Sequence, residues 1–119
     1  MSKILFVDDE KDFLENLEIL FTQFDDVSVD TVSDSTLVLK KAIQNPPDII
    51  FLDISMPKMD GPDVALALHE NASTAHIPIV FLTAIVSNAE KGDHGGQYFL
   101  PKPTGVVDIL ELTHKLAPS

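Results

Sequence analysis

Acidic residues directly follow two apolar runs of this chain, and a lysine follows a third. Asp8 and Asp9 come after the first run, Asp53 ends the second, and Lys102 stands before Pro103. Carboxylates brought to one edge of a sheet form a site for a divalent cation, and a lysine beside them can hold an anionic group. The pattern predicts a place where a metal ion and a phosphoryl group meet, which is typical of a switch rather than of a conventional enzyme.

The elements that must position these residues are short strands and amphipathic helices in alternation. Near-continuous apolar runs, such as the one at 49–52, indicate buried strands. Apolar residues recur at Phe13, Leu17, Leu20 and Phe24, which is the spacing of an amphipathic helix. We predict strands over 3–7, 27–32, 48–53, 78–83 and 97–100, and helices over 11–24, 33–44, 62–71 and 104–116.

The order of these elements predicts an α/β fold of the flavodoxin-like type. Strands that are apolar throughout argue for a parallel sheet covered by helices on both faces. The expected architecture is a (βα)5 doubly wound parallel sheet with strand order 2-1-3-4-5. Residues 85–96 combine modest helix formers with three glycines, so the fourth helix should be short or irregular. No linker or repeat interrupts the sequence, and we expect one domain over residues 1–119.

In this strand order the first and third strands are neighbours, so Asp8, Asp9 and Asp53 should converge at their carboxyl ends. Clustered carboxylates repel one another unless a proton or a cation neutralises them. Oxygen ligands without histidine or cysteine favour Mg²⁺ completed by water. Thr83 ends the fourth strand and Lys102 follows the fifth, which brings both to the same edge. The alternative, that the acids only cap helices or close turns, is weakened because these polar residues meet in one place.

The charge and composition restrict the partners. The formal charge is −11, from 19 acidic and 8 basic residues, and every basic residue is a lysine. Without arginine the chain lacks the side chain that reads guanine through two hydrogen bonds, and its negative charge repels phosphate backbones. Direct nucleic-acid binding by this domain is therefore not expected. With no cysteine, no signal peptide and no apolar run of the roughly 20 residues that span a bilayer, we expect a cytoplasmic protein without a membrane contact.

Four short motifs resemble the receiver domain of two-component response regulators, and the resemblance covers essentially the whole chain. Each motif is short, but their order along the chain and their placement at strand ends make the combination specific. The motifs are Phe6-Val7-Asp8-Asp9-Glu10, the run from Asp53 to Gly61 (Asp-Ile-Ser-Met-Pro-Lys-Met-Asp-Gly), Thr83-Ala84 and Lys102-Pro103.

The resemblance implies a phosphoacceptor site. Asp53 would accept a phosphoryl group from a sensor histidine kinase or a histidine phosphotransfer protein. Lys102 and Thr83 would contact the phosphoryl oxygens, because phosphoryl transfer depends on positioning and on neutralisation of negative charge. The implied ligands of Mg²⁺ are Asp8, Asp9, Asp53 and the backbone carbonyl of Ser55.

The resemblance also implies a switch. Thr83 would move toward the phosphoryl oxygens and Phe99 would turn inward into the vacated space; the alternative is that Phe99 is a permanent core residue. The face made by the fourth helix, the fifth strand and the fifth helix would then regulate a downstream protein effector or a fused output domain. Glu10 either belongs to the site or only complements the dipole of the helix that follows it.

Other functions fit the residues less well. A receiver-like interaction module that is never phosphorylated would not need Asp9, Asp53, Thr83 and Lys102 together. A phosphatase of the haloacid-dehalogenase type carries an Asp-x-Asp pair after its first strand, whereas Asp8 and Asp9 are adjacent. Neither a GxGxxG turn nor a P-loop is present for a nucleotide. The expected protein catalyses only its own phosphorylation and dephosphorylation and turns over no external substrate.

Overall fold

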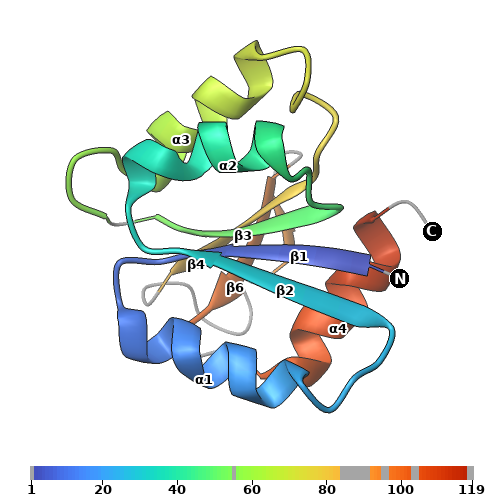
Figure 1. The fold of residues 1–119 in the computed structure, drawn as a ribbon. Coiled ribbons are helices and arrows are strands. Elements are labelled where there is room, and N and C mark those ends of the chain that lie inside the picture. Colours follow the sequence, from blue (N-terminus) through green and yellow to red (C-terminus); the bar gives the residue numbers. More distant parts are fainter. Residues whose placement is uncertain (1, 55, 84–91, 95–96, 103–104, 118–119) are drawn as a thin grey trace.

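In the described part of the chain, a six-stranded sheet carries helices on both faces (Figure 1). The computed structural model describes residues 2–54, 56–83, 92–94, 97–102 and 105–117. The strands are β1 (Ser2–Val7), β2 (Val27–Val32), β3 (Ile49–Asp53), β4 (Ile79–Thr83), β5 (Gly92–His94) and β6 (Gln97–Pro101). The helices are α1 (Lys11–Phe21), the 3-10 helix η1 (Ser35–Leu37), α2 (Val38–Gln44), α3 (Gly61–Glu70) and α4 (Val106–Leu116).

The strand order confirms the predicted topology. The sheet runs β2-β1-β3-β4-β6-β5, and the first five of these strands are parallel neighbours. Strand β6 takes the place of the predicted fifth strand, which yields the order 2-1-3-4-5. The short strand β5 pairs antiparallel with β6 at the edge and was not predicted. The predicted short fourth helix falls mainly on residues 84–91 and 95–96, which lie outside the described residues.

Two apolar layers hold the helices on the sheet. Strand β1 points Ile4 and Phe6 toward α1 and α4, and points Leu5 and Val7 toward α2 and α3. All five residues of β3 are buried, as expected for a central parallel strand with helices on both faces. This burial on both faces explains why the strand sequences are apolar without alternation.

The helix predicted over 33–44 is divided in two. Asp34 accepts hydrogen bonds from the backbone N–H and the hydroxyl of Thr36, which favours the tight 3-10 turn of η1 before α2 begins. The helix predicted over 11–24 ends earlier, at Phe21. None of the helices in the described part of the chain combines the length and the apolar character that crossing a bilayer requires.

Candidate functional site

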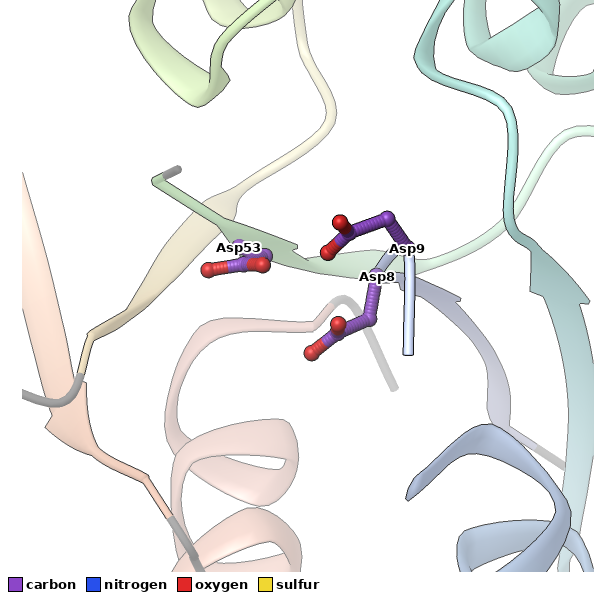
Figure 2. A group of neighbouring side chains, drawn as sticks. All are labelled: Asp8, Asp9 and Asp53. Atoms are coloured by element: carbon purple, nitrogen blue, oxygen red, sulfur yellow. The ribbon is translucent and has the colours of Figure 1, made fainter. Parts of the chain in front are cut away.

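Three carboxylates meet where β1 and β3 end (Figure 2). Val7 lies opposite Leu52 in the parallel pair β1–β3, so Asp8 comes directly after β1 beside the end of β3 at Asp53. Asp8, Asp9 and Asp53 can each offer one oxygen such that these atoms all lie within 4.8 Å of one another. The structure thus brings together the three acids that the sequence placed at this edge of the sheet.

Asp8 is the most enclosed of the three acids, because its residue is 0% exposed. Its Oδ1 accepts a hydrogen bond of 2.9 Å from the backbone N–H of Glu10, which closes the turn into α1. Its Oδ2 lies 2.8 Å from Nζ of Lys102, but no donor among the described residues is aligned with it as a hydrogen bond. The contact is therefore an ion pair without an aligned hydrogen bond.

Lys102 places a single ammonium among several acids. Its Nζ contacts the carboxylates of Asp8 and Glu10, and it lies 3.8 Å from Oδ2 of Asp53. The same ammonium lies 5.0 Å from the centroid of the Phe13 ring, within the range of a cation–π interaction. Burial disfavours the charged form, but the contacts with Asp8 and Glu10 outweigh it, so the pKa of Lys102 is raised above its ordinary value of 10.5.

The charges at this edge do not balance. Among the described residues, the carboxylates of Asp8, Asp9, Glu10 and Asp53 gather around the ammonium of Lys102, which leaves an excess of three formal negative charges in this group. Such an excess is relieved by protonation or by a cation. The donor set consists of oxygen atoms alone, and two of the three clustered acids are buried, which fits a hard divalent cation such as Mg²⁺.

The other predicted site residues fall near this cluster or outside the described residues. Thr83 is buried at the end of β4, the neighbour of β3, and its carbonyl accepts a 2.9 Å hydrogen bond from the backbone N–H of Lys102. Phe99 is half-buried on the α2–α3 face, where its ring stacks on that of Phe81 with centroids 5.6 Å apart. Ser55 and Pro103 lie outside the described residues.

Two contributors to the site were not assigned a role from the sequence. Gly61 packs so tightly that a Cβ there would lie 2.6 Å from the carbonyl oxygen of Asp53. The Asp-Gly-Pro run at 60–62 could have signalled such a close approach. The ring of Phe13, in α1, lies against the ammonium of Lys102, and no local sequence signal could have shown this contact.

Glu10 forms an ion pair with Lys102. This contact favours a role for Glu10 in the site over a role that only complements the helix dipole.

Comparison with known proteins identifies the family. A model of the response regulator receiver domain matches residues 4–114, and the chain belongs to this family. Domains of this family are generally signalling modules rather than enzymes.

Relatives and solved structures agree with the assignment. The response regulator PleD of Caulobacter vibrioides is 36% identical over 118 residues, which are 97% of this chain and 26% of PleD. The chemotaxis protein CheY4 of Vibrio cholerae is 27% identical with a TM-score of 0.80, covering 98% of each chain. The receiver domain of a sensor histidine kinase from Pseudomonas aeruginosa, with a magnesium ion coordinated in its active-site cleft, is 23% identical with a TM-score of 0.79, covering 97% of this chain and 96% of that one. The chain spans about a quarter of PleD and about half of the next curated relatives.

Proposed function

We propose that Asp53 accepts a phosphoryl group from the phosphohistidine of a sensor histidine kinase or of a histidine phosphotransfer protein. The observation that carries this proposal is the gathering of Asp8, Asp9 and Asp53 within 4.8 Å, with the Lys102 ammonium 3.8 Å from Asp53. A carboxylate at the end of a central strand, beside a lysine and two further acids, has the surroundings that an acyl phosphate needs.

The chemistry is an in-line displacement at phosphorus. A carboxylate oxygen of Asp53 attacks the phosphorus, the P–N bond to the donor imidazole breaks, and the imidazole leaves with the bonding electron pair and takes up a proton. Lys102 needs only a small movement to bring its ammonium to the phosphoryl oxygens, and the Thr83 hydroxyl donates a hydrogen bond to another oxygen. These groups stabilise the spread negative charge of the transition state.

The proposed metal is Mg²⁺. Its ligands would be Asp8, Asp9, Asp53 and the backbone carbonyl of Ser55. When bound, the ion supplies positive charge that offsets the repulsion between the acids and the incoming phosphoryl group. The support is the oxygen-only donor set and the excess of three negative charges at the site, together with the magnesium ion in the cleft of the Pseudomonas receiver domain.

The proposed consequence of phosphorylation is a change of surface. A phosphoryl group adds about −1.5 to −2 charge and strong hydrogen-bond acceptors, by analogy with other phosphorylated side chains. Thr83 moves toward these acceptors and Phe99 follows inward, which alters the face expected from the predicted fourth helix, the fifth parallel strand (β6) and the last helix (α4). If Phe99 is instead a permanent core residue, Phe99→Ala should leave the affinity of the phosphorylated protein for its partner unchanged.

The wider assignment rests on the same site. We infer one receiver domain over residues 1–119, located in the cytoplasm, which regulates a downstream protein effector or a fused output domain. It catalyses its own phosphorylation and dephosphorylation and acts on no external substrate. A receiver-like interaction module that is never phosphorylated is the second candidate, but the paired Lys102 and the three-acid cluster have no purpose in such a module.

Intact mass after incubation with acetyl phosphate and Mg²⁺ tests the proposal. Wild-type protein and an Asp12→Asn control, which changes an exposed acid of α1, should each gain one phosphoryl group. Asp53→Asn should gain none. A wild-type protein that is not modified and is also not stabilised by Mg²⁺ with beryllofluoride would establish the interaction module instead.

A further inference from the structure

The loop that leaves Asp53 returns to the same residue. The backbone N–H of Gly61 donates a 2.7 Å hydrogen bond to the carbonyl of Ile54, and Gly61 packs against the backbone of Asp53. Both ends of the loop are therefore fixed at the phosphoacceptor. The tip of the loop, at residues 57–59, lies between these two ends.

The tip of this loop holds a strained turn. Lys58 has φ 72°, a left-handed value that residues with a side chain seldom adopt. The backbone N–H of Met59 donates a 2.9 Å hydrogen bond to the carbonyl of Pro57, so the three residues form a γ-turn. A γ-turn with positive φ is rare and strained, and such strain persists only where neighbouring groups hold the backbone in place.

The groups that hold this turn come from the connection between β2 and α2. Ser35 is buried, with 4% of its surface exposed. Its hydroxyl donates a 3.0 Å hydrogen bond to the Pro57 carbonyl and accepts a 3.2 Å hydrogen bond from the Met59 N–H. Asp34 adds an ion pair, because its Oδ2 lies 3.3 Å from Nζ of Lys58. One hydroxyl thus bridges both sides of the strained residue.

We propose that Ser35 is a positioning residue for the metal and phosphoryl site. The hydroxyl of Ser35 acts through the loop: it fixes the tip at Pro57 and Met59, and the loop in turn orients the backbone that leaves Asp53. This loop carries the carbonyl proposed as a metal ligand, so the inference rests on the proposed function. Groups that orient metal ligands from outside the coordination shell commonly change metal affinity when they are removed.

Thr74 provides a matched control for a buried hydroxyl without this role. Thr74 is 1% exposed, and its hydroxyl donates to the carbonyls of Leu68 and Asn71, at 2.6 and 3.3 Å. It lies between α3 and β4, at the amino ends of the strands, on the edge of the sheet opposite the acidic cluster. Loss of either hydroxyl removes two hydrogen-bond contacts of a buried residue, but of the two residues only Ser35 touches the loop that leaves Asp53.

The test compares the Mg²⁺ affinity of wild type, Ser35→Ala and Thr74→Val by isothermal titration calorimetry. We expect the Kd of Ser35→Ala to rise about tenfold, the lower end of the range for groups that orient metal ligands, while that of Thr74→Val stays within about twofold of wild type. The rate of phosphorylation by acetyl phosphate should recover in Ser35→Ala at saturating Mg²⁺. An unchanged Kd in Ser35→Ala, or equal losses in both variants, would overturn the role of Ser35.

Two measurements keep the inference separate from protein stability and from the proposed function. If Ser35→Ala does not fold, hydrogen exchange of the Met59 amide in wild type replaces it: Mg²⁺ should slow this exchange, and no change would overturn the inference. A wild-type protein that binds no Mg²⁺ and takes up no phosphoryl group would refute the proposed function itself, whereas normal wild-type behaviour with an unaffected Ser35→Ala would refute the inference alone.

Discussion

The ammonium of Lys102 lies 2.8 Å from Oδ2 of Asp8 but 3.8 Å from Oδ2 of Asp53. Its closest partners are therefore Asp8 and Glu10. The carboxylate of Asp53, the proposed phosphoacceptor, lies farther from the ammonium than these two. A divalent cation bound by Asp8 would take over the neutralisation of that acid. Lys102 would then be released to pair with new negative charge on Asp53. The stability of the protein and its dependence on pH should both reflect this arrangement.

Loss of the lysine should destabilise the protein when no divalent cation is present. In Lys102→Met the fully buried Asp8 loses its ion-pair partner, and we expect the free energy of unfolding to fall by about 3 kcal/mol. Urea denaturation in EDTA measures this loss, and Mg²⁺ should restore part of it. Lys115→Met is the control, since Lys115 is exposed and lies over the Tyr98 ring. Equal stability of the two variants would contradict the prediction.

The raised pKa of Lys102 predicts a pH dependence of stability. The lysine has its ordinary pKa of 10.5 in the unfolded chain and a higher pKa when folded. Below 10.5 both states hold the proton, so the contribution is complete; above 10.5 the unfolded chain loses its proton first and stability falls. The difference in unfolding free energy between wild type and Lys102→Met in EDTA should be constant from neutral pH to 10.5 and then shrink. A difference that shrinks near neutral pH would mean that burial controls this pKa.

Asp9 should contribute to the binding of Mg²⁺ but not to the stability of the metal-free protein. Because Asp9 is exposed and adds to the repulsion of the cluster, Asp9→Asn should not lower the unfolding free energy in EDTA. Wild type should gain about 2.7 kcal/mol when Mg²⁺ is at one hundred times its Kd, and Asp9→Asn should lose most of this gain at the same concentration. Thermal unfolding with and without Mg²⁺ measures both. A full gain in Asp9→Asn would show that Asp9 is not a ligand.

Gly61 should be required for its small size. In Gly61→Ala the new Cβ would lie 2.6 Å from the Asp53 carbonyl oxygen and 2.8 Å from Cα of Ile54, so the backbone must shift. We expect a loss of about 1–3 kcal/mol in the unfolding free energy and a weaker affinity for Mg²⁺. Gly105→Ala is the control, because a Cβ there meets nothing within 4 Å; at this helix start its cost should stay below about 1 kcal/mol. Similar values for both variants in urea denaturation would disprove the steric argument.

Much of the fold could be predicted because the strands carry an unambiguous signal. A run such as Ile49–Asp53 is buried on both faces, so its sequence is apolar without interruption and its end is marked by the first acid. The break between η1 and α2 was not predicted, since it depends on side-chain hydrogen bonds from Asp34 that compete with regular helix. Strand β5 was also missed, because three residues at 92–94 have no periodicity and pair only through β6.

The sequence by itself determines the residue types of the acidic cluster, their places at strand ends and the excess of acids that could hold a cation, because each follows from a local pattern of burial and charge. It does not determine the contacts between distant segments. Lys102 forms ion pairs with Asp8 and Glu10, which lie far from it in the sequence. The hydroxyl of Ser35 likewise forms hydrogen bonds on both sides of Lys58, in a distant loop. Such contacts depend on how strands and loops pack in three dimensions, and only the folded chain decides which side chains meet.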